Sequence, residues 1–287
     1  MIDRATQAWV RATGRSVGLD EHPWLDGPVG SPKLIADEWL SREAQRLCGE
    51  LHEGGGLLES VGLLAGDSFD PSRLSPAIIE FYERTTEWRL DAWSQWSPLA
   101  LPAGWLLSTL FARRLQQLAL PLRPLDVAQG MESRVVALKS ADGRQLGAAW
   151  LRRLRSTGQV VYSGWYGSTQ LPGTNAPSIR VVFPLPNGSV TVFLRPSVDD
   201  AGALVLTSPI SVFGDDGAYL IVRTSEGIAA VRRVPLAEQF RVYIDDEGTL
   251  RTDHTLSLWS ARVLRFHYRL ERRAPSSDVL DSEGRGA

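Results

Sequence analysis

The sequence predicts an α+β protein whose main element is a large curved antiparallel β-sheet or barrel, covered by N-terminal helices. Three observations predict this fold. Residues 131–272 consist of short apolar runs without helical periodicity. Turn dipeptides interrupt these runs at short intervals, and the last third of the stretch alternates between apolar and polar residues. This combination indicates strands that follow one another as a meander.

Five dipeptides mark the expected hairpins, because each separates two strand-like runs: Asp142-Gly143, Thr157-Gly158, Asn187-Gly188, Glu226-Gly227 and Glu247-Gly248. We expect about nine or ten strands from this spacing. Connections this short cannot hold crossover helices, so neighbouring strands should be antiparallel. A flat open sheet would leave long unpaired edges, so we expect the sheet to curl or close, lipocalin-like or START-like in general character.

Helical periodicity is confined to the first part of the chain. Short helices are expected at residues 6–13 and 33–51. Ser75 followed by Pro76 is typical of a helix start, and the apolar and Trp-rich residues that follow predict a helix over residues 76–96. A one-sided leucine stripe predicts another helix over residues 104–118. These two helices should pack on the sheet.

The expected organisation has three parts. Residues 1–72 should form helices and loops that pack on the main domain. Residues 73–273 should form that domain, with the helix pair and the sheet. Residues 274–287 are small and polar, which predicts a disordered tail.

Composition limits the classes of function. With 31 basic against 33 acidic residues, the chain lacks the basic excess that nucleic-acid coating requires. One cysteine, Cys48, excludes an intramolecular disulfide and a cysteine-based metal site. No secretory signal and no apolar stretch long enough for a transmembrane segment occur, so we expect a cytoplasmic location. Contact with a membrane surface and a homodimer both stay open.

Strand alternation assigns the candidate site. Over residues 249–259 one face takes Leu250, Thr252, His254, Leu256 and Leu258, and in the following strand Phe266 and Tyr268 take the same face. The parity of residues 146–154 turns Trp150 and Arg152 inward, and Tyr162 lies nearby in the sequence. Polar groups on an apolar face need partners. Those partners are either neighbouring protein groups or the polar end of a ligand in a cavity.

The predicted ligand-binding residues are therefore His254, Arg152, Trp150, Tyr162, Tyr268 and Phe266, and His254 is also a candidate for catalysis. The sequence contains no metal-ligand spacing, no nucleotide-binding fingerprint and no nucleophile elbow, so we expect neither metal nor cofactor. These observations favour a cytoplasmic binding protein for an apolar small molecule such as a lipid, polyketide or polyene, serving as a biosynthetic accessory protein.

Two alternatives stay open. The first is a cyclase or isomerase of the same fold, with one acid/base residue. The second is a non-catalytic interaction module that docks a partner through the Trp-rich helix or through an outward arginine face made of Arg223, Arg232, Arg233, Arg265 and Arg269.

One block of the sequence, FYERTTEW followed by WSP and then RRLQQL, resembles a recurring block of uncharacterised bacterial proteins. The resemblance covers about residues 78–135 and brings no activity with it. It implies only that charged residues of this block, including Arg113 and Arg114, contribute more than surface charge.

Overall fold

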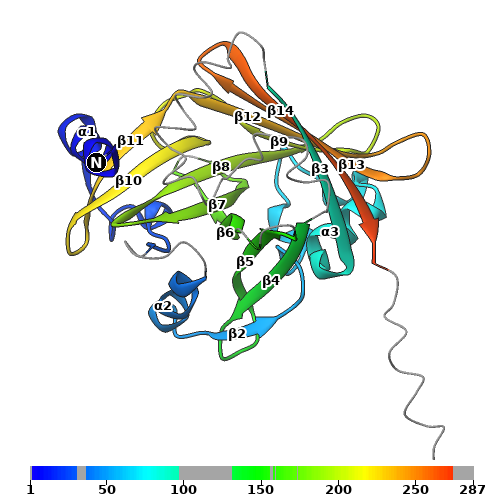
Figure 1. Ribbon diagram of the computed structural model, residues 1–287, viewed down its shortest axis with the longest axis horizontal. Coiled ribbons are helices and arrows are strands. Elements are labelled where there is room, and N and C mark those ends of the chain that lie inside the picture. Colours follow the sequence, from blue (N-terminus) through cyan, green and yellow to red (C-terminus); the bar gives the residue numbers. More distant parts are fainter. Residues whose placement is uncertain are drawn as a thin grey trace, which may run out of the picture.

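The computed structural model describes residues 2–30, 37–96, 131–155, 158, 160–172 and 174–273. In these residues the chain is mostly antiparallel strand with few helices (Figure 1). The helices are α1 (Ile2–Thr13), α2 (Glu38–Arg46) and α3 (Pro76–Glu83), with four short 3-10 turns between or after them, at Pro23–Leu25, Val61–Leu64, Pro71–Arg73 and Thr85–Glu87.

The strands before residue 131 are β1 (Arg15–Gly18), β2 (Glu50–Glu53) and β3 (Trp88–Trp96). The later strands are β4 (Met131–Lys139), β5 (Gln145–Leu154), β6 (Val160–Gln170), β7 (Pro177–Leu185), β8 (Gly188–Val198), β9 (Leu204–Ser208), β10 (Gly217–Ser225), β11 (Ile228–Val234), β12 (Leu236–Ile244), β13 (Leu250–Leu258) and β14 (Ala261–Arg272). The stretch expected to hold about nine or ten strands thus holds eleven in its described part.

The sheet branches at β8. The first part of β8, Gly188–Phe193, pairs with β10, whereas its last part, Arg195–Val198, pairs with β9. One arm of the sheet, which we call the first wing, runs β2-β4-β5-β6-β7-β8-β10-β11-β1. The other arm, the second wing, runs β9-β12-β13-β14-β3. Every pairing between these strands is antiparallel, as the short connections predicted.

The sheet is bent but not closed. Its path ends at β2 on one side and at β3 on the other, and these two strands do not pair with each other in the part of the chain described. The curved-sheet form of the prediction is therefore confirmed and the barrel form is wrong. The predicted turns at Asp142-Gly143, Asn187-Gly188, Glu226-Gly227 and Glu247-Gly248 each join two consecutive strands.

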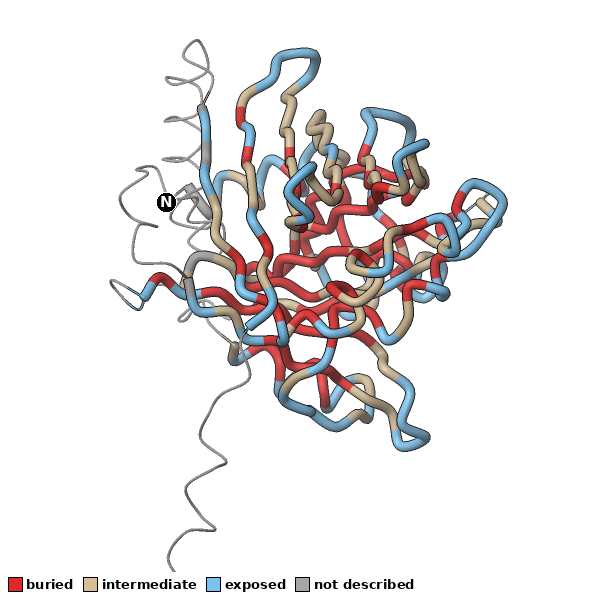
Figure 2. Tube along the Cα trace, turned by 90° about the vertical axis from the view of Figure 1, so that its right-hand side faces the viewer, coloured by how far each residue is buried: buried red, intermediate tan, exposed pale blue. Residues whose placement is uncertain are grey.

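Both faces of the central strands of the first wing, β5 to β8, are largely buried. Its inner face joins the largest apolar cluster, which includes Trp150, Val181 and Val192. Its outer face is covered by N-terminal segments, because Trp24 packs on Phe193 and Tyr219, and Trp39 of α2 packs on Trp165. Figure 2 shows the resulting concentration of buried residues along the central strands.

Only one face of the second wing is buried. In β13 the side chains at Leu250, Thr252 and His254 are buried, whereas the intervening residues are half-exposed. The outer face holds polar groups such as Asp253 and His267, whose Oδ1 and Nδ1 atoms lie 2.6 Å apart. This difference between the wings explains why the alternation is clean only in the last third of the sequence.

The helix predicted over residues 76–96 is wrong in its second half. The helix begins at Pro76 with Ser75 at its N-cap, as expected, but it ends at Glu83. From Trp88 the chain is strand β3, which pairs with β14 so that Leu90 faces Leu270. The periodicity of a short aromatic-rich segment is compatible with either helix or strand. Here the segment pairs with β14, whose edge would otherwise be unpaired, and this pairing favours the strand.

The remaining expectations fall at the N-terminus or outside the described residues. The helix expected at 6–13 corresponds to α1, and the one at 33–51 is shortened to α2, because residues Glu50–Glu53 form strand β2. Strands β1 and β2 show that the segment expected to pack on the sheet also contributes to it. The helix expected at 104–118 and the tail at 274–287 lie outside the described residues.

Candidate functional site

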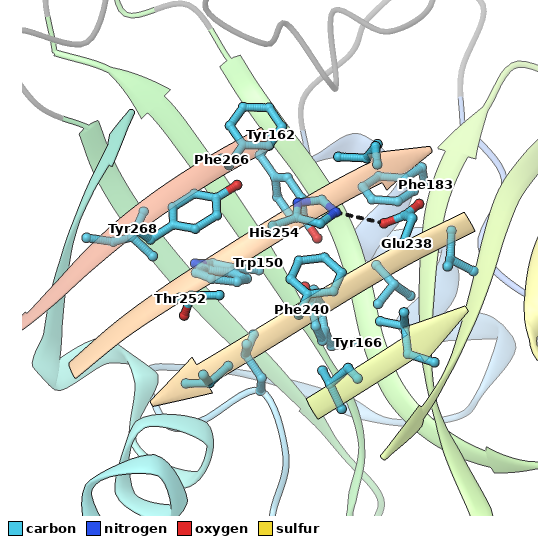
Figure 3. A pocket seen from close by; sticks show the side chains of 18 of the residues that line it. Trp150, Tyr162, Tyr166, Phe183, Glu238, Phe240, Thr252, His254, Phe266 and Tyr268 are labelled. Carbon is cyan, nitrogen blue, oxygen red and sulfur yellow. Dashed lines mark hydrogen bonds and ion pairs between the residues drawn. The ribbon is translucent and has the colours of Figure 1, made fainter. Parts of the chain in front are cut away.

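A cavity of about 180 Å³ lies between the inner faces of the two wings (Figure 3). Strands β5 to β8 of the first wing line one side, and strands β9 and β12 to β14 of the second wing line the other. Leu57, Phe81, Tyr82 and Leu90 complete the wall from α3, β3 and the preceding loop. We call this space the inter-wing cavity.

All six residues predicted for the site line the inter-wing cavity. Arg152, Trp150 and Tyr162 reach it from the first wing, and His254, Phe266 and Tyr268 reach it from the second. Strand parity therefore turned Trp150, Arg152, His254, Phe266 and Tyr268 to the face that lines the cavity, whereas Tyr162 was included only for its position in the sequence. That these residues bind a ligand stays a prediction.

Aromatic rings form much of the wall. The ring of Trp150 lies 5.6 Å from that of Tyr162 and 5.7 Å from that of Tyr166, both in edge-to-face arrangements. Gly164, the cross-strand neighbour of Trp150, has no side chain there, and a Cβ at this position would lie only 3.0 Å from the Tyr162 hydroxyl oxygen. A glycine at this point lets the Tyr162 ring lean along the strand toward Trp150.

Arg152 is the cation of the cavity. Its side chain is buried, at 8% exposure, and its Cζ lies 3.6 Å from the centroid of the Trp150 ring. The rings of Tyr162 and Tyr268 lie further off, at 5.0 and 5.8 Å. Contacts of this kind stabilise a guanidinium through the electron-rich faces of the rings. They leave the N–H groups in the guanidinium plane available to an acceptor.

Four tyrosines at the cavity keep their protons at neutral pH. Burial raises the pKa of Tyr82, Tyr162, Tyr166 and Tyr268, because a phenolate would be desolvated there. For Tyr268 the pKa rises to about 12, although the charge of Arg152 and a hydrogen bond with it act in the opposite direction. The phenols are therefore neutral hydrogen-bonding groups rather than bases at pH 7.

His254 is held by a carboxylate and by two rings. Its Nε2 lies 3.1 Å from Oε2 of Glu238, and both side chains are 11% exposed. Phe240 stacks on the imidazole at 3.6 Å between centroids, and Phe266 lies on the other side at 5.6 Å. The three rings occupy one row of cross-strand neighbours on β12, β13 and β14. In Figure 3 a dashed line marks the contact between His254 and Glu238, which lie on adjacent strands of the same wall.

Sequence reasoning missed several members of the wall, among them Glu238, Phe240, Tyr166 and Phe183. The first two could have been found. The alternation of the 236–244 run places Leu236, Glu238, Phe240, Val242 and Ile244 on one face, and that face is the inner one. Tyr166 and Phe183 belong to strands buried on both faces, where alternation carries no information.

The chemistry that the wall can support is limited. Thr252 is the one serine or threonine among the lining residues that the structure describes, and the same set contains no cysteine and no lysine. No group of three or more His, Cys, Asp or Glu side chains that could hold a metal occurs in the described part of the chain. Glu238 and His254 are the pair that could exchange a proton with a bound molecule.

The outward arginine face of the second alternative is engaged within the molecule. Arg223 pairs with Asp26, Arg265 with Asp253 and Arg269 with Glu271. Arg232 donates to the carbonyl of Thr13, and Arg233 donates to carbonyls of the loop before β10. Arg223, Arg232 and Arg233 therefore bind segments distant in the sequence, whereas Arg265 and Arg269 form half-exposed ion pairs on the outer face of the second wing. The Trp-rich helix of the same alternative is strand β3, so this part of the prediction is wrong.

Comparison with known proteins gives one informative likeness. Over 220 residues the chain is 32% identical to the protein of Bacillus subtilis (strain 168) named "Uncharacterized membrane protein YndJ". The alignment covers 74% of this chain and 37% of that protein, so the chain spans little more than a third of its relative's length. No family model matches the chain, and no solved structure matches it.

Among the residues that the structure describes, no helix has both the length and the apolar character needed to cross a membrane.

Proposed function

We propose that the protein binds a small apolar molecule in the inter-wing cavity. The observation that supports this most directly is the lining of the cavity, which is aromatic and aliphatic apart from a few polar groups that converge on it: Arg152, Glu238, Thr252, His254 and the tyrosine hydroxyls. Ligand pockets have this character, because apolar walls supply affinity and a few fixed polar groups supply orientation. A curved sheet that encloses its ligand would resemble a lipocalin in this general respect.

The volume of the cavity limits the size of ligand that it can hold. A cavity of about 180 Å³ is close to the roughly 150 Å³ of an engineered apolar cavity that binds benzene. It is smaller than the roughly 300 to 1,000 Å³ of pockets for drug-sized ligands. We therefore favour a molecule with one ring or a short acyl chain over an extended lipid, polyketide or polyene.

A catalytic role in the same fold is the second candidate, and the Glu238–His254 pair is the observation that favours it. A carboxylate that holds one imidazole nitrogen fixes the orientation of the ring toward a bound molecule. Such a pair suits an isomerisation or cyclisation, which needs a proton moved but no external nucleophile. A biosynthetic accessory role and a cytoplasmic location remain parts of this proposal.

The proposal is tested by filling the cavity. Leu206 lines the cavity from β9, whereas the next residue, Thr207, lies on the opposite face of the same strand. We expect Leu206→Phe to abolish binding of one-ring probes such as toluene and indole, and Thr207→Phe to leave it unchanged. Binding is followed by the rise in melting temperature that a ligand of the native state produces.

Native mass spectrometry of the freshly purified protein supplies the second measurement. A co-purified small molecule present in wild type and in Thr207→Phe, but absent from Leu206→Phe, would support the proposal. If the probes raise the melting temperature of all three proteins equally, they bind elsewhere and the cavity is not a ligand site.

A further inference from the structure

The inter-wing cavity holds a buried cation that has no direct carboxylate partner among the described residues. The Nε atom of Arg152 is buried and has no hydrogen-bond partner in the described part of the chain. Glu238 is the one carboxylate among the described lining residues, and it is paired with His254, Nε2 to Oε2 at 3.1 Å. A guanidinium cannot lose its proton at physiological pH, so its charge persists in the buried site.

The groups around Arg152 pack against the flat faces of its guanidinium, but they do not supply acceptors for all of its in-plane N–H groups. Trp150 lies over the guanidinium at 3.6 Å from Cζ to the ring centroid, and the Tyr268 hydroxyl takes one hydrogen bond. An aromatic face attracts a cation without accepting an N–H in the guanidinium plane. Among the residues that the structure describes, the remaining donors therefore lack the planar, two-oxygen acceptor that a guanidinium fits best.

A second donor lies beside the first. Tyr162 is the cross-strand neighbour of Arg152 on β6. Its buried hydroxyl interacts with that of Tyr166, which contributes to its raised pKa, but no partner among the residues described meets it with the geometry of a full hydrogen bond. Burial raises the pKa of this phenol, so it retains a proton to donate. Arg152 Nε and the Tyr162 hydroxyl are therefore two donors on adjacent strands of one cavity, and an acceptor that reached both would satisfy them better than the described protein groups do.

We propose that the ligand of the inter-wing cavity is a small monocarboxylic acid, whose carboxylate is held by Arg152 and the Tyr162 hydroxyl and whose ring or short chain occupies the aromatic part of the cavity. This inference rests on the proposed binding function and names its ligand class. A carboxylate supplies the in-plane acceptors that the guanidinium lacks and neutralises its charge. The aromatic and aliphatic wall takes the rest of the molecule, as Phe240 and Phe266 face the same space.

The test compares acids with their neutral amides by isothermal titration calorimetry. Phenylacetate is paired with phenylacetamide, and hexanoate with hexanamide. For wild type we expect the acid of each pair to bind roughly tenfold or more tightly than the amide, because a hydrogen bond to a charged group is the stronger kind. We expect Arg152→Leu to weaken the binding of the acid by a similar factor, while the affinity for the amide changes little.

Two further variants test the hydroxyl of Tyr162 and provide a control for the removal of an arginine. Tyr162→Phe keeps the ring and removes the hydroxyl. It should therefore weaken the binding of the acid several-fold and leave the affinity for the amide almost unchanged. Arg153→Leu removes an exposed cation from the opposite face of the same strand and should change neither affinity. If circular dichroism shows that Arg152→Leu is unfolded, Tyr162→Phe and Arg152→Lys carry the test.

The outcomes separate this inference from the binding function itself. If acids and amides bind wild type equally and Arg152→Leu alters neither, the carboxylate assignment is overturned while the apolar cavity remains a binding site. If no acid and no amide binds, and Leu206→Phe behaves as wild type, both proposals fail. Acid-selective binding that is lost in both Arg152→Leu and Leu206→Phe supports both.

Discussion

Glu238 on β12 and His254 on β13 form a hydrogen-bond contact within a largely buried apolar face, although they are not direct cross-strand partners. The register pairs His254 with Phe240 and Glu238 with Leu256, so the carboxylate reaches the imidazole along a diagonal. Phe240 stacks on the ring and restricts it to an orientation in which Nε2 meets the carboxylate. The pair thus satisfies two buried polar groups that neither strand satisfies alone.

The first prediction is that Glu238 and His254 are energetically coupled. His254→Phe preserves the stacked row but leaves the carboxylate without its partner, so it should destabilise the fold by about 1 to 3 kcal/mol. Glu238→Met should have a similar cost. Because both partners are apolar in the double variant, it should be more stable than the sum of the single changes predicts, by at least about 1 kcal/mol. Urea denaturation gives the four free energies.

His267→Phe is the control for this cycle. His267 also contacts a carboxylate, Nδ1 to Oδ1 of Asp253 at 2.6 Å, but its side chain is 36% exposed on the outer face of the second wing. Exposed pairs contribute about 1 kcal/mol or less. Additive effects of Glu238→Met and His254→Phe would mean that the buried pair contributes nothing to stability, and the structural role assigned to it would be wrong.

The sequence predicted the second wing better than the first, and burial explains the difference. Strands β13 and β14 have one face toward solvent, so their polar and apolar residues alternate and His254, Phe266 and Tyr268 could be assigned a face. Strand β7 is buried on both faces and is apolar almost throughout. Nothing local in that strand indicates that Phe183 rather than Val182 faces the cavity.

The partners within the site could not be predicted, because they depend on how the two wings meet. Arg152 and His254 line the same cavity only because β8 branches and brings the inner faces of β5 and β13 opposite each other. A branch of this kind is set by long-range pairing and has no turn dipeptide or periodicity of its own. The strand β3 was missed for a related reason, since its partner β14 lies some 170 residues later in the chain.

The second prediction tests β3 as a strand. In a strand, Leu90 and Trp93 lie on opposite faces, and their exposures are 7% and 50%. Leu90→Ala should therefore cost about 2 to 4 kcal/mol, because it opens a hole in the core that contains the cavity. Trp93→Ala should cost less than about 1 kcal/mol despite the larger side chain removed. Urea denaturation of the two variants checks the difference, and a larger loss for Trp93→Ala would contradict the strand.

The last prediction concerns alkaline pH, and it follows from the tyrosines. The pKa is raised for all six tyrosines of the chain, with burial as the largest cause in each case. In the unfolded chain a phenol ionises near pH 10. Tyr268 in the folded protein ionises at about 12, so between these values the unfolded state has lost protons that the folded state keeps.

Stability must therefore fall as pH rises above about 10, because the state with fewer bound protons is favoured at high pH. The contribution of a protonated Tyr268 is fully present below about pH 10 and is lost as the pH approaches 12. Absorbance at 295 nm should show that the tyrosines of the folded protein ionise at a clearly higher pH than those of the protein unfolded in guanidinium chloride. Tyr268→Phe should flatten the decline of the unfolding free energy between pH 10 and 11. If instead the folded and unfolded proteins titrate together near pH 10, the hydroxyls reach solvent and are not buried in the inter-wing cavity.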